Sequence, residues 1–372
     1  MKVPVNEPLL TQNAKKYVNQ CLDTNWISSA GEFITKFEEK FCSFNKMKYG
    51  VANSSGTASL HLAMLSLEIG KGDEVILPAQ TMISTAAAVM YVGARPVLVD
   101  SEIDTYNMDT NKIESKITKK TKAILMVDLF GHPVDYKPIL KIAKNYNLFT
   151  IDDAAQAHGA KYNDKNVGSM TDISCFSFYA NKIITTGEGG MMLTNNKKIF
   201  ENAKLYRDMY HNKNQRFFHD KIGYNYRMTN LQAAIGLAQL EKIEKFIKIK
   251  KMMAKRYIKN LKNVKGIKLP IEKDYAKSVY WMFTILINEK DFGINRNQLM
   301  NELRKNKIDT RTTFISLNKQ PPIKKWYKNQ KYPVSEHVEK TGMYLPSGLA
   351  ITNKQIDYVS ECIKKIHKKY NL

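Results

Sequence analysis

The sequence lacks several features that mark whole classes of protein. No apolar run approaches the roughly 20 residues needed to span a bilayer, which argues against a membrane protein. The first residues, MKVPVNEPLL, lack the apolar core of a signal peptide, so we expect no export by that route. There are only four cysteines, with no C-x-x-C pair and no zinc-ligand spacing. A reducing, cytoplasmic location fits this cysteine usage.

Arginine is also scarce, with eight residues against fifty lysines. The net charge of +23 is typical of nucleic-acid or membrane binders, but these lysines are scattered along the whole chain. Base readers favour the planar arginine fork, whereas scattered lysine forms a solvated surface. We therefore predict no nucleic acid and no membrane as partner, although the charge helps to attract an anionic small substrate. A non-enzymatic anion or nucleic-acid binder is the alternative from a different class, and it predicts duplex binding that falls steeply with salt.

What is present is ordinary globular composition, with 43% hydrophobic and 25% charged residues in a chain of 372. From about residue 45 to 195, short apolar runs alternate with helical patterns. Such alternation predicts right-handed crossovers and a mainly parallel sheet, in which ligands bind at the carboxyl ends of the strands. The expected strands are 73–79, 95–100, 122–128, 147–153, 173–178 and 190–195.

From about residue 230 the pattern changes to a long amphipathic stretch followed by shorter mixed segments. We expect one long helix or two in series, then a strand, a helix and a closing helix. These elements cover 229–261, 280–290, 295–307 and 353–369. The chain is thus predicted to be α/β, with a large domain and N-terminal segment in residues 1–235 and a small C-terminal domain in 236–372.

The segment VANSSGTASLHLAML is a small polar loop that leads into a helix. Gly56 permits close backbone approach, and the amides of Gly56, Thr57 and Ala58 open the helix. A helix N-terminus with free N–H groups suits a phosphate dianion, while an ordinary serine-capped helix is the alternative. The loop lacks the G-x-x-x-x-G-K-[ST] and G-x-G-x-x-G spacings, which argues against nucleoside-triphosphate and dinucleotide folds.

In FTIDDAAQAHGA an apolar strand ends in Asp152 and Asp153, followed by Gln156 and His158. A carboxylate at this position can bind a metal, act as a base or pair with a cationic ring nitrogen; acids here also cap the next helix. No second cluster of histidine and carboxylate residues accompanies the pair. We therefore predict no metal site.

Lys182 differs from most other lysines because it lies between an aromatic apolar strand and Ile183–Ile184, before the turn-rich TTGEGG. Apolar surroundings disfavour the charged amine, which makes it nucleophilic and able to form a Schiff base. The alternative is a strand-end lysine that extends its ammonium to solvent. Together the three segments offer amides for a phosphate, an acid for a ring nitrogen and an amine for an aldehyde. Those are the attachment points of pyridoxal phosphate.

At these motifs the sequence resembles the fold-type-I, pyridoxal-phosphate-dependent nucleotide-sugar aminotransferases of the DegT type. The resemblance covers nearly the whole chain, from NWISSAGEFITKFEEKF through SSGTASLHLA, ILPAQTMIS, DDAAQAHGA and FSFYANKIITTGEGG to MYLPSGLAITNKQI. It implies a mainly parallel seven-stranded sheet in the large domain, a smaller C-terminal α/β domain and pyridoxal 5'-phosphate as cofactor. It also implies a homodimer with shared active sites.

Carried over by position, the resemblance assigns Lys182 as the catalytic residue, which binds the cofactor and shuttles the proton. It matches Asp153 with the partner of the pyridinium nitrogen and Gln156 with a side chain near the ring's O3′. The predicted phosphate contacts are Gly56, Thr57 and Ser177, with Asn225 in GYNYRM donated by the other subunit.

Two positions depart from the family pattern. Met82 stands where many relatives have an aromatic residue stacked on the cofactor ring, and its thioether can lie on a ring face. Asn318 stands where perosamine-synthase-like relatives tend to have a histidine near the sugar. The predicted substrate-side residues are Trp26, Ser28, Arg227, Arg311 and Asn318, with packing, capping or an interface salt bridge as their alternatives.

Within the family, NKIITTGEGGMM and HDKIGYNYRMTNLQAAIGLAQLE most resemble the perosamine synthases. This implies transfer of the amino group of L-glutamate to the C4 keto group of a nucleotide-linked 4-keto-6-deoxy sugar, with a GDP sugar favoured. The product would serve glycan biosynthesis, such as the O-antigen of lipopolysaccharide. Related dehydratases have histidine where Lys182 stands, so the lysine favours transamination. The same chemistry at C3, or on a UDP- or dTDP-linked sugar, is the closer alternative.

Overall fold

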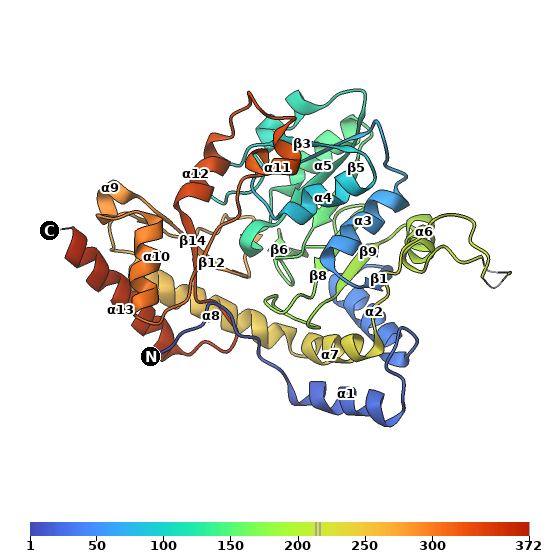
Figure 1. Ribbon diagram of the computed structural model, residues 1–372, viewed down its shortest axis with the longest axis horizontal. Coiled ribbons are helices and arrows are strands. Elements are labelled where there is room, and N and C mark those ends of the chain that lie inside the picture. Colours follow the sequence, from blue (N-terminus) through green and yellow to red (C-terminus); the bar gives the residue numbers. More distant parts are fainter. Residues whose placement is uncertain (213, 216, 372) are drawn as a thin grey trace.

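The protein is described by a computed structural model that covers residues 1–212, 214–215 and 217–371. Its larger part is built on a seven-stranded sheet in the order β1-β9-β8-β5-β4-β2-β3 (Figure 1). Neighbouring strands are parallel except at β9, which is antiparallel to both β1 and β8. The strands are β1 Tyr49–Asn53, β2 Glu74–Pro78, β3 Arg95–Val99, β4 Thr121–Val127, β5 Phe149–Asp153, β8 Ile173–Ser177 and β9 Gly190–Thr194. All six predicted strands and the seven-stranded sheet are confirmed.

Helices cover both faces of this sheet, which explains why its central strands are apolar almost throughout. Side chains of α3, α4 and α6 belong to one buried cluster, and those of α2, α5 and α7 belong to another. The two clusters are the two sides of the sheet. The helices are α2 Glu32–Asn45, α3 Gly56–Ser66, α4 Ile83–Tyr91, α5 Tyr136–Asn145, α6 Lys197–Arg207 and α7 Asn230–Leu240.

The predicted stretch 229–261 forms two helices in series, α7 and then α8 (Ile243–Leu261). They lead into a smaller antiparallel sheet of order β10-β12-β14-β13, which packs on α8, α10 and α13 around its own core. Its elements are β10 Ile267–Lys268, β12 Phe283–Ile287, α9 Glu289–Phe292, α10 Arg296–Lys305, β13 Arg311–Thr312, α11 Pro321–Lys324, α12 Pro333–Thr341, β14 Gly342–Leu345 and α13 Asn353–Tyr370. The proposed domain boundary after residue 235 falls inside α7 and stays a prediction.

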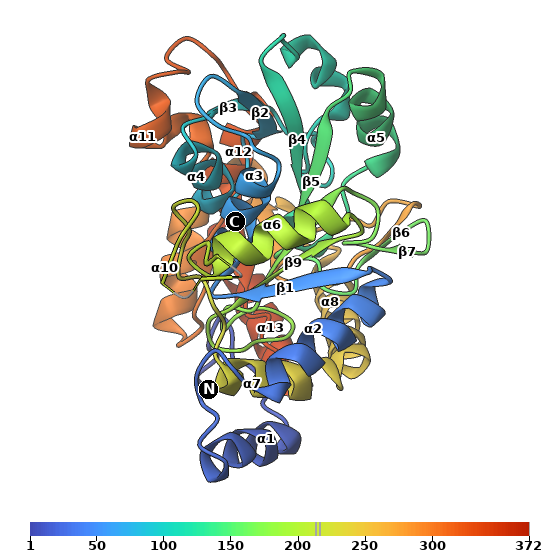
Figure 2. The same cartoon turned by 90° about the vertical axis from the view of Figure 1, so that its right-hand side faces the viewer.

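Two segments connect the parts of the molecule. The first residues run along the small sheet, where Val3 N donates to Lys307 O at 2.9 Å, before α1 (Gln12–Asp23) packs on α7 (Figure 2). A third sheet joins β11 (Ala276–Lys277) to the pair β6 (Lys161–Tyr162) and β7 (Lys165–Asn166). Within the part of the chain that the structure describes, no helix is long and apolar enough to cross a membrane.

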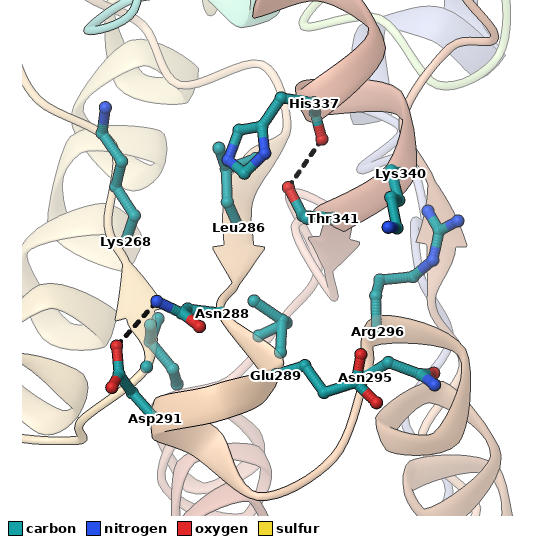
Figure 3. A pocket seen from close by; sticks show the side chains of 13 residues that line it. Lys268, Leu286, Asn288, Glu289, Asp291, Asn295, Arg296, His337, Lys340 and Thr341 are labelled. Atoms are coloured by element: carbon teal, nitrogen blue, oxygen red, sulfur yellow. Dashed lines mark hydrogen bonds between the residues drawn. The ribbon is translucent and has the colours of Figure 1, made fainter.

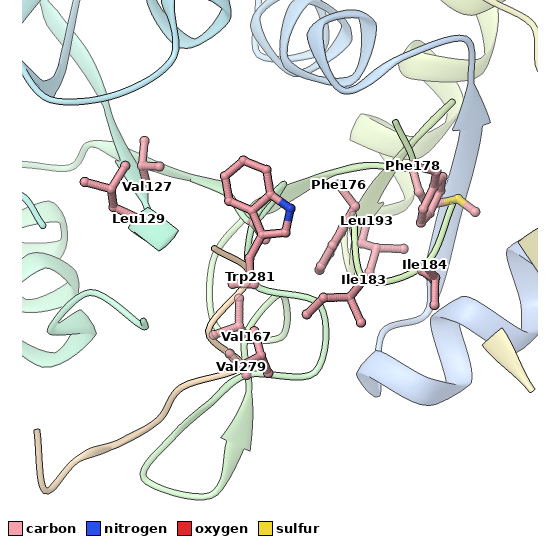
Figure 4. Close-up of a cluster of buried hydrophobic side chains, with 14 of the residues drawn as sticks. Val127, Leu129, Val167, Phe176, Phe178, Ile183, Ile184, Leu193, Val279 and Trp281 are labelled. Carbon is pink, nitrogen blue, oxygen red and sulfur yellow. The ribbon is translucent and has the colours of Figure 1, made fainter. Parts of the chain in front are cut away.

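Part of the apolar cluster on the α2, α5 and α7 side of the large sheet is drawn in Figure 4. Val127 and Leu129 come from the end of β4, Phe176 comes from β8, and Trp281 lies just before β12. The Trp281 side chain is only 4% exposed, although it belongs to the chain that leads into the small sheet. The small domain therefore shares this buried cluster with the large sheet.

Candidate active site

A cavity of about 320 Å³ lies at the carboxyl ends of β5 and β8. Most of its lining comes from the large domain, and the small domain contributes Trp281 and Phe314. This is the sheet edge where the alternating pattern predicts a ligand. The cavity brings together seven of the predicted site residues: Gly56, Thr57, Met82, Asp153, Gln156, Ser177 and Lys182.

Lys182 lies in the loop after β8, where its backbone N–H donates to Tyr179 O at 2.9 Å. Its side chain lines the cavity, and its Nζ is 3.9 Å from the centroid of the Trp281 ring. Desolvation lowers the pKa of Lys182 to about 8, while the nearby Asp153 carboxylate acts in the opposite direction. An amine with this pKa supplies a useful fraction of nucleophile near neutral pH.

The strand geometry of β5 distinguishes Asp153 from Asp152. Successive side chains of a strand point to opposite faces, and only Asp153 lines the cavity. Asp152 is buried on the other side, where the Tyr136 hydroxyl contacts its carboxylate and that of Asp128, each at 2.8 Å. Of the two acids that the sequence left open, Asp153 is therefore the one that faces a ligand.

Asp153 is held by two donors at the cavity wall. Thr85 Oγ1 donates to its Oδ2 at 2.8 Å, and the N–H of Ala155 donates to its Oδ1 at 3.3 Å. Burial raises the pKa of Asp153, and the Thr85 hydrogen bond and the charge of Lys182 oppose that shift. A buried carboxylate of this kind gains from a cationic partner, and a protonated ring nitrogen is one.

The first turn of α3 forms the other end of the cavity. Ser55 caps the helix by accepting from the N–H of Ala58 at 3.1 Å. The amides of Gly56 and Thr57 come first in the helix, and such amides have no acceptor within it. A Cβ at position 56 would lie 2.7 Å from the Cβ of Ser177, so only glycine lets the helix end approach β8 this closely. These amides and the Ser177 hydroxyl fit a phosphate.

Three further residues of the predicted motifs lie in or near this wall. Gln156 is buried, and its Oε1 accepts from the N–H of Phe130 at 2.8 Å. Met82 is the residue before α4 and keeps 46% of its surface exposed at the cavity. His158 is not among the lining residues; it is packed against Phe176 and Phe178, and burial lowers its pKa to about 3.

Two predicted substrate-side residues lie outside the cavity, at the start of the chain. Trp26 lines a separate hollow beside α7, where its carbonyl accepts from Asn230 Nδ2 at 2.7 Å. The carbonyl of Ser28 accepts from the N–H of Asn230 at 2.6 Å. Neither residue lines the cavity of its own chain.

Arg311 and Asn318 also lie outside the cavity lining. Arg311 is exposed on β13 and pairs with Asp309 at 2.6 Å. Asn318 is buried, and its amide accepts from Ser316 Oγ at 2.6 Å and donates to Glu336 Oε1 at 3.0 Å. The small domain instead reaches the cavity through Trp281 and Phe314.

The arm, residues 208–227 apart from 213 and 216, extends away from the body of the molecule (Figure 1). Arg227 and Asn225 lie at its base, where Tyr226 O accepts from the N–H of Ser54 at 2.8 Å. Arg227 pairs with Asp208, and Asp208 and Asn225 form an isolated β-bridge at the base of the arm. Asn225 is exposed and does not line the cavity of its own chain.

Sequence reasoning missed Thr85 and Trp281. The signal for Thr85 was one of two polar residues, Ser84 and Thr85, at the start of the apolar helical stretch ISTAAAVMY. Trp281 carried no local signal, because only the folded chain brings the start of β12 beside Lys182. A search by motif spacing finds neither.

A second, larger cavity of about 700 Å³ lies in the small domain, between β10, β12, α10 and α12 (Figure 3). It mixes basic residues with two acids, and Asp291 accepts from Asn288 Nδ2 at 2.6 Å. Most of its charged side chains are exposed to solvent, including Lys340, His337 and Glu289. In the described residues that line it, no buried carboxylate faces a lysine.

The fold and the first cavity together define a pyridoxal-phosphate-dependent enzyme: a desolvated lysine and a buried carboxylate lie with an open helix N-terminus at the carboxyl edge of a mainly parallel sheet. The chain belongs to the DegT/DnrJ/EryC1/StrS aminotransferase family, whose sequence model matches residues 8–364. It is a sugar aminotransferase with pyridoxal phosphate as its cofactor.

Known relatives extend over the full length of the chain. It is 44% identical to the GDP-perosamine synthase of Escherichia coli O157:H7 over 98% of both chains. It is 38% identical to that of Caulobacter vibrioides, again over 98% of both. Among solved structures, a putative sugar aminotransferase of Streptococcus pneumoniae in its PMP form matches with a TM-score of 0.93 and 26% identity, covering 100% of this chain and 99% of the other. The expected fold class is thereby confirmed.

Proposed function

We propose that this protein transfers the amino group of L-glutamate to the C4 keto carbon of a GDP-linked 4-keto-6-deoxy sugar, for glycan or O-antigen biosynthesis. The observation that carries the chemistry is the desolvated Lys182 beside Asp153 in the cavity at the sheet edge. The choice of sugar is supported by two full-length relatives that bear the name GDP-perosamine synthase.

The cavity residues divide the work of amino transfer. When bound, pyridoxal phosphate supplies an electron-accepting ring that stabilises negative charge on the reacting carbon. Lys182 Nζ would hold the cofactor at its aldehyde carbon, and the free amine would move the proton at the Cα of the donor. The Asp153 carboxylate, oriented by Thr85, holds the positive charge of the ring nitrogen. Gln156 would lie near the ring's O3′ and Met82 against the ring face, since both line the cavity.

At the other end of the cavity, Gly56, Thr57 and Ser177 hold the phosphate. We propose that Asn225 completes this cradle in the partner subunit of a homodimer. One feature supports this role: Asn225 is exposed and does not line the cavity of its own chain. Phe218 and Ile222 of the arm are also exposed, as expected for a surface that a second subunit covers.

On the substrate side we propose roles for five residues. Arg311 and Arg227 are cations that can meet an anionic group of the nucleotide sugar, if they exchange their carboxylate partners Asp309 and Asp208. The remaining three, which we assign to the sugar or nucleotide, are Trp26, Ser28 and Asn318.

We also propose that the reaction takes place in the cytoplasm. All four cysteines are free, buried thiols, as expected in a reducing compartment. The glutamate donor and the nucleotide-linked acceptor are both charged and do not cross membranes unaided, so an enzyme that uses them is expected in the compartment where they are made.

The test is a two-stage assay of the purified protein. First, pyridoxal phosphate is added and the visible spectrum recorded before and after L-glutamate; we expect a band that glutamate bleaches. Second, the glutamate-treated protein is given GDP-, UDP- and dTDP-linked 4-keto and 3-keto sugars, and the amine product is identified by mass spectrometry. Amination only of the GDP-linked 4-keto sugar supports the proposal. Bleaching followed by amination of another sugar would show that the other sugar is the substrate. The absence of a band at saturating cofactor would contradict the assignment of Lys182.

A further inference from the structure

Trp281 lies against the amine at the centre of the proposed chemistry. The Nζ of Lys182 is 3.9 Å from the centroid of the indole ring, well within the range of a cation–π contact. Trp281 is 4% exposed and belongs to the apolar cluster drawn in Figure 4. A cation–π contact gains strength as its partners are removed from water, and here Trp281 is buried and Lys182 half-buried.

Both ends of Trp281 are fixed by hydrogen bonds. Its indole Nε1 donates to the carbonyl of Asn181, the residue before Lys182, at 2.8 Å. Its own carbonyl accepts from the Nζ of Lys250 on α8 at 2.6 Å, and the same amine donates to Ser347 O. The indole of Trp281 is therefore bonded to the Lys182 loop, and its backbone is bonded to α8.

Lys250 is an unusual anchor because it is a buried cation held by carbonyls. It is 2% exposed, and burial lowers its pKa to about 7. Within the described residues, no carboxylate lies at ion-pair distance from it. A lysine buried without a counter-charge is costly, so its two carbonyl contacts are what keep it in place.

We propose that Trp281 is a positioning residue for Lys182: its indole face holds the free ammonium in the cavity, and Lys250 fixes the backbone of Trp281 so that the face stays in position. This inference rests on the proposed role of Lys182 as the cofactor-binding amine. It explains how a side chain with four rotatable bonds is kept in one place each time it is released.

Several titratable groups around Lys182 influence the charge of its amine. Asp153 from β5 favours the charged amine, and burial disfavours it. Glu188 and Tyr179 also line the cavity, and the charge of Lys182 contributes to lowering the pKa of His158. The indole face adds a second attraction for the cation, so its loss makes the charged amine less favourable.

The test uses cofactor-free protein and follows the rate at which trinitrobenzenesulfonate modifies Lys182, measured by peptide mass spectrometry as a function of pH. In Trp281→Leu we expect the midpoint to fall by about one pH unit, and in Trp281→Phe by clearly less, because phenylalanine keeps an aromatic face. Both variants lose the hydrogen bond to Asn181. Equal midpoints in all three proteins, or equal shifts in the two variants, would overturn the proposal.

A second measurement leaves position 281 untouched, in case its variants do not fold. The chain has three tryptophans, so Trp26→Phe with Trp326→Phe leaves Trp281 as the only indole emitter. We expect its fluorescence to titrate at the midpoint of Lys182 modification and this transition to vanish in Lys182→Met. Emission that does not follow Lys182 would refute the contact.

Lys250→Met tests the anchor. We expect the Lys182 midpoint to fall in the same direction as in Trp281→Leu, whereas lower thermal stability with an unchanged midpoint would remove Lys250 from the account. All three experiments use cofactor-free protein, so they are independent of the sugar. A wrong substrate leaves these midpoints intact, and a protein that fails to bind the cofactor is recognised from its visible spectrum.

Discussion

Two cavities of this protein differ in volume and in chemistry, and the larger one has the less buried charges. The small-domain cavity is the larger, about 700 Å³ against about 320 Å³, and carries several charged side chains (Figure 3). Most of those charges are exposed to water, whereas Asp153 in the smaller cavity is buried and held by hydrogen bonds. Charged groups removed from water have shifted pKa values and directed interactions. Burial of charge therefore locates the chemistry better than volume does.

The strongest way to break this comparison is to remove the amine of the smaller cavity. Lys182→Ala is expected to abolish the visible cofactor band and to lower the rate of amino transfer by at least ~10³-fold, because it removes both the covalent attachment and the proton carrier. The measurement is the spectrum with glutamate, together with steady-state product formation. The matched control is Lys340→Ala in the larger cavity, where activity within twofold of the wild type is expected; a comparable loss there would contradict the account.

The next test removes the charge of Asp153. Asp153→Asn is expected to slow the glutamate half-reaction roughly 100-fold, the size typical of one preorganised polar contact. The carboxylate favours the charged form of Lys182, whose pKa is about 8, so its loss lowers that pKa further. Since the free amine is the nucleophile, the pH at which cofactor capture levels off should move down from about 8. Stopped-flow capture between pH 5.5 and 9.5, sampled at about half-unit steps, measures it. A shift of this pH to a higher value would contradict the expected effect of Asp153 on the pKa of Lys182.

Two glycine substitutions test the end of the cavity that is proposed to bind the phosphate. In Gly56→Ala the new Cβ would lie 2.7 Å from that of Ser177, so the helix end must move away from β8. Overpacking of this kind costs about 1–3 kcal/mol, and we expect cofactor affinity to fall at least ~10-fold. Gly70→Ala is the control, because its nearest neighbour would be Val92 O at an ordinary 3.8 Å. Equal affinities in the two variants, measured by fluorescence titration, would remove the helix end from the site.

The smallest effect is expected in the larger cavity. Lys340→Gln removes an exposed charge of α12, and surface changes of this kind alter the free energy of unfolding by less than about 0.5 kcal/mol. Thermal unfolding and glutamate-dependent bleaching should both match the wild type. A change in the bleaching rate would mean that this cavity communicates with the active site.

Much of this architecture could be predicted because it depends on local patterns. Apolar runs such as KAILMV specify strands buried on both faces, and the helices between them require a parallel sheet. The order of motifs placed Lys182, Asp153 and Gly56 at one edge, and the structure brings them into one cavity. Strand alternation then separates Asp153 from Asp152, a distinction that needs the position of the sheet.

The rest depends on contacts that no local pattern records. Trp281 reaches Lys182 only because the small domain packs on the end of the large sheet. Asn225 does not line the cavity of its own chain, so its proposed role needs an assembly of two chains. For Asn318 the sequence predicts a place near the sugar, and in the folded chain its amide bonds to Ser316 and Glu336.

The central claim is that one lysine among fifty carries the chemistry. The most direct test is to load the protein with pyridoxal phosphate, reduce it with borohydride and map the labelled peptides by mass spectrometry. The account predicts one label per chain, on Lys182, and its absence when glutamate is added before reduction. Label on another lysine, or label spread over the surface lysines without preference, would contradict it.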